Sequence, residues 1–524
     1  MSEEKQPDTP PVEPVDTNEQ KLQEIRGPVP HKVWLVQGLY FLERAAFYGL
    51  SQMLQNYLQL SPDNPVRPGA LGLGEARAVL IIYVWFIYSY STPMIGGLLA
   101  DCWLGRRKTI QIGFLIYSLG LALVTATAFS QRYHGVGGLP GFIVGMFLVG
   151  AGTGTVKPNI TVFLIDQFPE EEPKVVVLKN GTSALQSRKL TISFIWNVNY
   201  WMINVGGLCG IITTNVEKYA GFGYAFLICL CLIVASATIF QAGYLKFETS
   251  PSTGNAIAEV SKALRRQRAL KHHSTRQAAI TDPPYTGQDG EATAEEDKAT
   301  IAEAKSALRA CLVFLPFPAL MLSINLMDST LIAQAGTMQT HGLPNDIMYN
   351  LNPISVMVFL PLFQSLLYPF LSKRKLNFSA EHRIGVGLFC AALAIGYTTG
   401  IQHLIYSSGP CYSYPLTCRG DAVPNEVNVG LQTPTYVFLA WGEILAIVAG
   451  TELAYSRAPA SMKSIVQALF NLFSALGSVL GVGVSFAAYN PNMVIVYGSI
   501  TALCLFVTVA FEMSYLVRGK VPGG

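Results

Sequence analysis

The chain has 524 residues, of which 51% are hydrophobic and only 13% are charged, and its mean hydropathy is +0.36. Soluble domains carry roughly 25% charged residues, so this chain has too few to cover the surface of a soluble protein of its length. The formal net charge of +3 implies no acidic partner, and the absence of a basic patch interleaved with aromatic residues argues against a nucleic-acid-binding protein.

Two polar stretches and a short tail lie outside the apolar part of the chain. Residues 1–30 are acidic and proline-rich and have no apolar core, so they are not a secretory signal and we predict a disordered cytosolic tail. Residues 248–306 are predicted to be a cytosolic connector, and residues 519–524 a short cytosolic tail. The connector includes a predicted amphipathic helix near 257–268, interpreted as part of a linker on the membrane surface, with a partner-binding site as the alternative.

The remaining sequence consists of apolar runs separated by short polar loops. Each run is long enough to cross a bilayer as a helix, which takes roughly 20 residues. The runs cover residues 33–58, 77–100, 108–129, 139–164, 190–213, 222–246, 308–335, 346–371, 383–405, 434–456, 464–488 and 493–517. Six fall in 31–247 and six in 307–518, which predicts an all-α integral membrane protein with about twelve transmembrane helices. Two six-helix bundles are the natural arrangement, because paired halves build a site at the bilayer midplane.

Lysine and arginine are unevenly distributed among the loops. The predicted inner loops carry Arg106, Arg107, Lys108, Lys174, Lys179, Arg188, Lys189, Lys373, Arg374, Lys375 and Arg383. The predicted outer loops carry Arg67, Arg132, Lys218 and Arg419. Since positive residues concentrate on the cytosolic side, this bias places both termini and the basic connector in the cytosol.

Two of the nine cysteines lie in a polar loop. Cys411 and Cys418 fall in a segment that the predicted topology places outside, where an oxidising compartment permits a disulfide between them. The other seven lie in or beside apolar segments and are interpreted as small packing residues.

Ionisable side chains inside membrane helices are costly and mark candidate functional sites. They are Glu43 and Arg44 in the first predicted helix, Lys157 in the fourth, Asp328 in the seventh and Glu443 in the tenth. Glu43 and Arg44 are neighbours and point about 100° apart on a helix, so we expect each to have a partner on another helix or to face a cavity.

Lys157 needs a counter-charge, and Glu443 from the other half is the expected partner. A charge pair between the two halves would act as a gate that substrate or protons release. The alternative is a static buried bridge that fixes the helix register.

Enzyme chemistry has no candidate residues in this sequence. The histidines lie in loops or at predicted helix ends, no metal-ligand spacing occurs, and no Ser-His-Asp set can be argued. We therefore predict neither catalytic residues nor a metal or cofactor.

Several motifs occur in a fixed order along the predicted helices. They are GGLLADCWLGRRK (96–108), GTGTVKPN (152–159) with LIDQF (164–168), NYWMINVGGLCG (199–210) and ELAYSRAPASMKS (452–464). With them, residues 33–517 resemble the proton-coupled oligopeptide transporter family of the major facilitator superfamily, and particularly its fungal members. The resemblance implies a major facilitator fold with alternating access, proton symport of di- and tripeptides, no cofactor other than protons as the coupling ion, and a lipid bilayer as the surroundings. The plasma membrane is the expected location, with the vacuolar membrane as the alternative.

The resemblance also implies roles for single residues. Arg44 and Lys157 match positions that face the peptide carboxylate and couple to protons, and Glu43 matches a proton-handling glutamate. Glu443 matches the glutamate that receives the peptide ammonium group. The other positions that match substrate-binding residues of the family are Tyr48, Tyr90, Asn204, Asn352, Phe470 and Ser474.

Two positions depart from the family pattern. Tyr40 replaces the first glutamate of the E-x-x-E-R motif, and Asn325 replaces the acidic residue of the seventh helix. Asp328 lies one turn further on and is a candidate substitute for that acid. These departures leave two alternatives open: the same fold carrying another solute, such as a peptide-derived secondary metabolite or a nitrate-like ion, possibly uncoupled from protons, and a non-transporting membrane nutrient sensor.

Overall fold

The structure is a computed structural model that describes residues 23–64, 69–130, 135–168, 174–177, 183–248, 259–268, 288–374, 378–416, 418, 423–459 and 462–518. Within this part of the chain, nine helices are long and apolar enough to cross a membrane, and a bent pair of helices makes a tenth candidate. The bent pair is Glu295–Phe314 and Phe317–Gly336, at 52° to each other. Pro316 and Pro318 lie at the bend and explain it, because proline donates no backbone hydrogen bond and clashes with a continuing helix.

The N-terminal half contains helices that follow the first six predicted runs. They are α1 (His31–Ser51), α2 (Leu54–Gln59), α3 (Glu75–Leu99) with the π-helical turn η1 (Ala100–Leu104), α4 (Arg106–Phe129), α5 (Leu139–Asp166), α6 (Arg188–Gly207), α7 (Cys209–Ala220) and α8 (Phe222–Gly243).

The C-terminal half follows the other six runs. Its helices are α10 (Gln288–Ala310), α11 (Phe317–Asn325), α12 (Thr330–Gly336), α13 (Leu351–Leu362), α14 (Tyr368–Lys373), α15 (Ala380–Ser407), α16 (Thr433–Gly442), α17 (Val448–Arg457), α18 (Lys463–Ser485) and α19 (Met493–Arg518). Short 3-10 or π-helical turns join several of them, including η5 (Leu326–Asp328), η6 (Asn345–Asn350) and η9 (Glu443–Ile447).

Two predicted runs form helices that fall outside the set of candidate spans. These are α1 and the pair α6 and α7, which occupy the first and fifth positions of the predicted order. Glu43 and Arg44 in α1, and three asparagines in α6, lower the hydropathy of these helices. Polar residues at these two positions are what a solute cavity between the halves requires.

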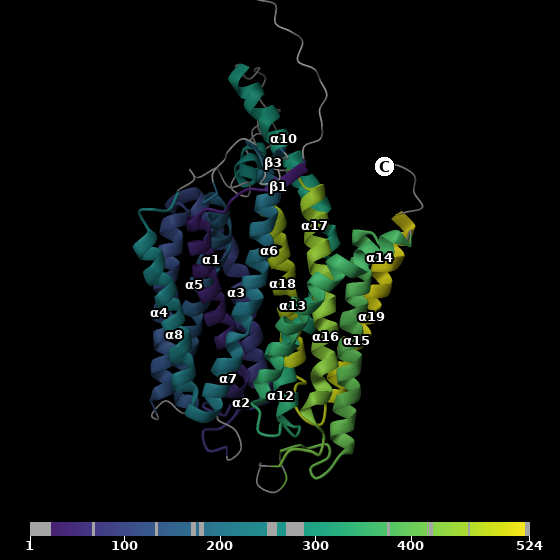
Figure 1. Ribbon diagram of the computed structural model, residues 1–524. Coiled ribbons are helices and arrows are strands. Elements are labelled where there is room, and N and C mark those ends of the chain that lie inside the picture. The colour runs from purple at the N-terminus through teal and green to yellow at the C-terminus, as the bar shows by residue number, and fades with distance from the viewer. Residues whose placement is uncertain are drawn as a thin grey trace, which may run out of the picture.

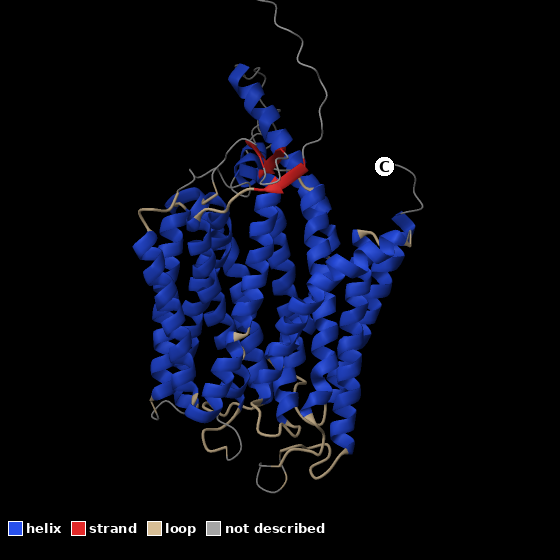
Figure 2. Cartoon of the chain, in the orientation of Figure 1, coloured by secondary structure: helices blue, strands red, loops and turns tan. Residues whose placement is uncertain are grey.

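The two halves stand side by side and are built almost entirely of helices (Figures 1 and 2). In the first half α4 packs on α5 and α8, and α1 packs on α6 and α8; in the second, α15 packs on α16 and α19, and α11 on α18. The halves meet where α3 packs against α18, α6 against α13, and α7 against η6. Strand β1 (Gln23–Arg26) and the end of α19 lie at the same end of the molecule, as an even number of crossings requires (Figure 1).

A small sheet at this end was not predicted. Strand β1 pairs in parallel with β3 (Ser183–Ser187), which pairs antiparallel with β2 (Lys174–Val177), in the order β1-β3-β2. The backbone N–H of Gly27 then donates to Thr191 Oγ1 at 2.8 Å. The prediction that all of 1–30 is disordered is therefore wrong for residues 23–26, which gain a strand partner from a distant part of the chain.

The connector also differs from the prediction at its end. A helix covers residues 259–268, inside the predicted amphipathic segment. Helix α10 runs across the predicted boundary between 306 and 307, so the connector and the seventh membrane segment share one helix. Ala304 and Ala307 of α10 pack with Met462, which ties the connector to the C-terminal half.

The cysteine loop lies at the opposite end of the molecule from β1. Cys411 and Cys418 form a disulfide in the structure, with their Cα atoms 5.5 Å apart.

Candidate functional site

A cavity lies between the two halves and contains about 760 Å³ of empty space, part of it open to solvent. Helices α1, α3, α5 and α6 supply one wall, and α11, η5, η6, α13 and the start of η9 supply the other. The lining residues are Arg44, Phe47, Tyr48, Ser51, Phe86, Tyr90, Lys157, Ile203, Asn204, Gly207, Ile324, Asn325, Met327, Asp328, Tyr349, Asn352, Pro353 and Glu443. A concave site lined by aromatic side chains with a few polar groups among them is typical of small-molecule sites.

Arg44 and Glu43 form a bidentate ion pair at the buried centre of α1. Arg44 Nε donates to Glu43 Oε2 and Nη2 to Oε1, both at 2.5 Å. Thr153 of α5 bonds to both groups, at 3.1 Å from Arg44 Nη2 and 3.2 Å from Glu43 Oε1. The expectation that each residue would have a partner on another helix or face a cavity is met by Thr153 of α5 and, for Arg44, also by the cavity. The two residues pair with each other as well, because their long side chains bend toward the same point on α5.

Tyr40, which replaces an acidic residue of the family pattern, covers this pair from the side. Its ring centre lies 5.6 Å from the Arg44 guanidinium carbon, and the Phe47 ring centre lies 4.7 Å from the same atom. Aromatic faces stabilise a nearby cation. Tyr40 therefore presents an aromatic face to Arg44 at a position where the family pattern has a glutamate.

Lys157 reaches the cavity from α5, next to Pro158, which interrupts the hydrogen bonding of that helix. The ammonium group lies within electrostatic range of Glu43 and Arg44. Among the described residues, Lys157 Nζ makes no ion pair or hydrogen bond. The carboxylate of Glu43 is already shared with Arg44, so Lys157 carries the cation on this wall that a solute anion can approach.

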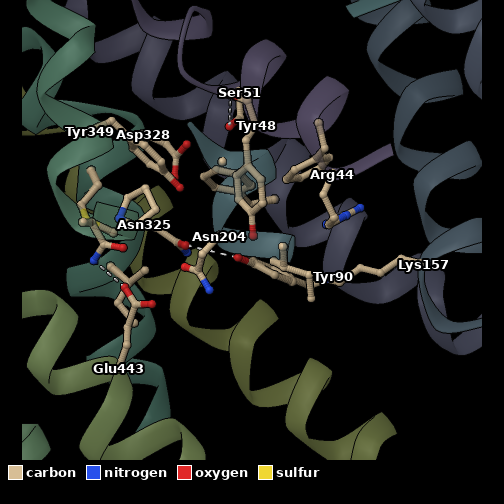
Figure 3. A pocket seen from close by; sticks show the side chains of 18 residues that line it. Arg44, Tyr48, Ser51, Tyr90, Lys157, Asn204, Asn325, Asp328, Tyr349 and Glu443 are labelled. Carbon is tan, nitrogen blue, oxygen red and sulfur yellow. Dashed lines mark hydrogen bonds between the residues drawn. The ribbon is translucent and has the colours of Figure 1, made fainter. Parts of the chain in front are cut away.

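Glu443 lies on the opposite wall, where it begins the π-helical turn η9 within the tenth membrane segment. Such turns interrupt helices at functional sites. Asn352 Nδ2 of α13 donates to Glu443 Oε1 at 2.8 Å. The predicted pair of Lys157 with Glu443 is not formed: the two side chains lie on opposite sides of the cavity (Figure 3). The positive charge of Lys157 and the negative charge of Glu443 are therefore separated by the cavity.

Asp328 is placed by a break in the seventh membrane segment. Helix α11 ends at Asn325, and the 3-10 turn η5 turns Asp328 toward the cavity before α12 begins. The Asp328 carboxyl faces the side chain of Ser51 on α1, so these two cavity residues approach each other from the two halves. Asp328 is 7% exposed and therefore a buried acid in contact with the cavity.

Tyrosine and amide groups complete the polar lining. Tyr90 donates to Asn325 Oδ1 at 3.4 Å, and Asn325 Nδ2 donates to Ser478 Oγ at 3.0 Å. Asn325 thus occupies the position expected for an acid and links α3 to α18. Asn204 also lines the cavity, and its Nδ2 donates to the Tyr200 carbonyl of its own helix at 2.9 Å.

Two residues assigned by resemblance are not among those that line the cavity. Phe470 packs against Phe314 and Phe317, with ring centres 5.7 and 6.2 Å apart. Ser474 is buried and donates to the Phe470 carbonyl at 2.9 Å. Both residues support the packing of α18 against the start of the seventh segment in this conformation.

Sequence reasoning missed three polar groups at the site. Ser51 and Tyr349 line the cavity, and Thr153 bonds to the ion pair behind it. Tyr349 lies three residues before Asn352 in the same predicted run, so a polar cluster in an apolar run was the available signal. Ser51 and Thr153 gave no such signal, because single hydroxyl residues are common in membrane helices and bond to their own backbone.

The cavity as a whole is dipolar. Cations from Arg44 and Lys157 lie on the wall of the N-terminal half, and carboxyl groups from Asp328 and Glu443 lie on the wall of the C-terminal half (Figure 3). A polar solute cavity between two bundles of membrane helices defines a secondary transporter of the major facilitator type.

The family model described as "PTR2: POT family" matches residues 107–503, and the chain belongs to this family of proton-dependent oligopeptide transporters. The chain is 34% identical to the peptide transporter PTR_C of Candidozyma auris, over 94% of this chain and 85% of that protein. It is 33% identical to the probable peptide transporter ptr2 of Schizosaccharomyces pombe, over 94% of this chain and 79% of that protein.

Solved structures of the family have the same fold. The crystal structure of the POT family transporter PepTSo matches with a TM-score of 0.73 at 19% identity, and the match covers 94% of this chain and 100% of that chain. An auto-inhibited POT family peptide transporter matches with a TM-score of 0.70 at 21% identity, covering 94% of this chain and 98% of that one.

Proposed function

We propose that this protein imports di- and tripeptides together with protons by alternating access. The observation that carries the proposal is the separation of charge across the cavity, with Lys157 on one wall and Glu443 on the other. A short peptide is a zwitterion whose carboxylate and ammonium groups lie at opposite ends. Its carboxylate is attracted to the cationic wall and its ammonium to the anionic wall.

Proton coupling is assigned to the carboxyl groups next to these binding groups. A proton on Glu43 removes the charge that holds Arg44 in the bidentate pair, and the guanidinium becomes available to the peptide carboxylate. A proton on Asp328 removes the charge that would have to be buried between the halves when the cavity closes. In this proposal Glu43, Arg44, Lys157 and Asp328 couple protons to peptide binding.

The proposed location is the plasma membrane, with the vacuolar membrane as the alternative and both termini in the cytosol. The position of β1 and the end of α19 at one end of the molecule supports termini on the same side (Figure 1). The basic residues of the connector and of the loops at that end support the cytosolic assignment.

Uptake of a labelled dipeptide into proteoliposomes tests the proposal. An inward proton gradient is expected to drive accumulation above the external concentration, and collapse of the gradient is expected to abolish accumulation. Flux that only equilibrates would identify an uncoupled carrier. Absence of flux for dipeptides and tripeptides would reject the peptide assignment, and the alternative solutes would then be screened.

Asp328→Asn is expected to reduce the maximal accumulation of peptide, since one of the coupling protons is lost. The limiting accumulation ratio should fall by about tenfold for each pH unit of gradient, because one pH unit on one proton is worth about 1.4 kcal/mol. Peptide exchange without a gradient should be retained. Asp63→Asn, at an exposed loop residue, is the control. An unchanged accumulation ratio in Asp328→Asn would remove this residue from the coupling set.

A further inference from the structure

Two buried carboxyl groups meet at the end of the molecule opposite β1 and α10. Glu217 lies in the last turn of α7, and Asp346 lies in the first turn of η6. Their carboxyl groups lie close enough to share a hydrogen bond, and the residues are 2% and 0% exposed. Helix α7 belongs to the N-terminal half and η6 to the C-terminal half, so this contact crosses the interface between them.

The contact requires a proton. A carboxylate only accepts hydrogen bonds, so two carboxyl groups can bond to each other only when one of them is protonated. Two buried carboxylates at this separation would repel strongly, with little water to screen them. The closed arrangement of these helix ends therefore contains one proton shared by Glu217 and Asp346.

Neutral amides hold the two carboxyl groups in place. Asn56 Nδ2 donates to Glu217 Oε1 at 3.1 Å and to Asn345 Oδ1 at 3.0 Å, and Asn345 Nδ2 donates back to Asn56 Oδ1 at 2.9 Å. A second amide contact between the halves joins Asn350 Nδ2 to Gln52 Oε1 at 2.9 Å. These amides do not titrate, so the carboxyl pair is the pH-sensitive part of this contact.

The other titratable groups around the pair come from few elements in the described part of the chain. Lys218 and Tyr219 of α7 donate to the Gly342 carbonyl, and His341 bonds to Asn428. Tyr436 of α16 lies within electrostatic range of Asp346, and Tyr349 is the other titratable residue of η6. Helices α2, α12 and α13 contain no Asp, Glu, Lys, Arg or His, and α8 contains none either.

We propose that Glu217 and Asp346 form a proton-binding latch at the outer gate, one that binds a proton when the outer ends of the two halves close. When the ends separate, water reaches both groups, both ionise, and the proton returns to the outside. The latch therefore makes outer closure sensitive to external pH without adding to the protons carried per peptide. This inference rests on the alternating access of the proposed function, but it concerns the gate and not the peptide site.

The population of the closed outer gate can be measured directly. Spin labels are attached at Asp63→Cys and Leu431→Cys, two exposed positions on the outer ends of the two halves, after the exposed Cys102 and Cys231 are replaced by serine. Distances are recorded without peptide in acidic and in mildly alkaline buffer. The ratio of closed to open molecules is expected to fall by up to about tenfold per pH unit, the limit for one linked proton.

Glu217→Gln is expected to remain closed and to lose this pH dependence, because its amide donates to the Asp346 carboxylate as the shared proton does. Asp346→Asn should behave in the same way and provides a second variant if the first does not fold. Glu426→Gln, at an exposed carboxyl of an outer loop, is the matched control. Any reduction of the pH slope that every folded latch variant shows and the control does not share supports the latch. A slope equal to that of the wild type, or a wild type whose distances do not respond to pH, overturns it. Because no peptide is present, this result is independent of whether peptides are the substrate.

Discussion

Replacing Glu443 with glutamine is expected to weaken the binding of peptides with a free amino terminus by about 10- to 100-fold. A hydrogen bond to a charged group contributes about 1.5–3 kcal/mol, and 1.4 kcal/mol corresponds to a factor of ten in affinity. The glutamine side chain has the same shape, and its oxygen can still accept the hydrogen bond from Asn352. The change therefore removes the charge and leaves the packing of η9 intact.

The distinguishing feature of this prediction is its dependence on the substrate. N-acylated peptides have no ammonium group, so their inhibition constants against labelled dipeptide uptake should change little in Glu443→Gln. Glu452→Gln is the matched control, since Glu452 lies further along the same membrane segment with an exposed side chain and pairs with Arg383. An equal loss of affinity for free and acylated peptides would contradict the role assigned to Glu443.

The architecture of this protein is largely determined by patterns that a single sequence displays. Apolar runs, charged loops and a polar connector specify how many times the chain crosses the membrane and in which direction. The three short strands were missed because their pairing joins residues 23–26 to residues 183–187, and no local pattern indicates it. The seventh segment was predicted as one run, whereas Pro316 and Pro318 divide it and let it continue from α10.

The sequence identified the charged residues of the site, but it did not predict which of them form ion pairs. Glu43, Arg44, Lys157, Asp328 and Glu443 were identified because charges are expensive inside a membrane. Which of them form pairs depends on side-chain conformation, and helix periodicity does not specify it. Periodicity separated Glu43 from Arg44, yet the flexible side chains meet at Thr153. Lys157 and Glu443 have opposite charges, yet the cavity lies between them.

That arrangement divides the charged groups into two kinds. Arg44 already has a counter-charge in Glu43, so its charge is neutralised in the resting site and released only by a proton. Lys157 and Glu443 both face the cavity. Among the described residues, Glu443 has only the neutral Asn352 amide as a hydrogen-bond partner, and the Lys157 ammonium has none. In the proposed cycle Lys157 and Glu443 recognise the peptide. The Arg44–Glu43 pair makes this recognition depend on protons.

Removing Lys157 is accordingly expected to abolish proton-driven uptake. In Lys157→Ala the cationic wall keeps only Arg44, which is bound by Glu43 until a proton arrives. The peptide carboxylate then has no cation that is available from the start, and losing one charge-assisted contact costs about 10- to 100-fold in affinity. The electrostatic influence of the ammonium group on Glu43 is lost as well, so proton binding and peptide binding are no longer linked.

Measuring driven uptake and gradient-free exchange side by side separates these two effects. Lys157→Met keeps the length of the side chain without its charge, and it should fail like Lys157→Ala if charge is what matters. Lys463→Ala, at an exposed position where α18 begins, should transport like the wild type. Driven uptake that survives in both Lys157 variants would make this lysine a structural residue. Coupling would then have to reside in Glu43 and Asp328, two buried acids near the peptide cavity.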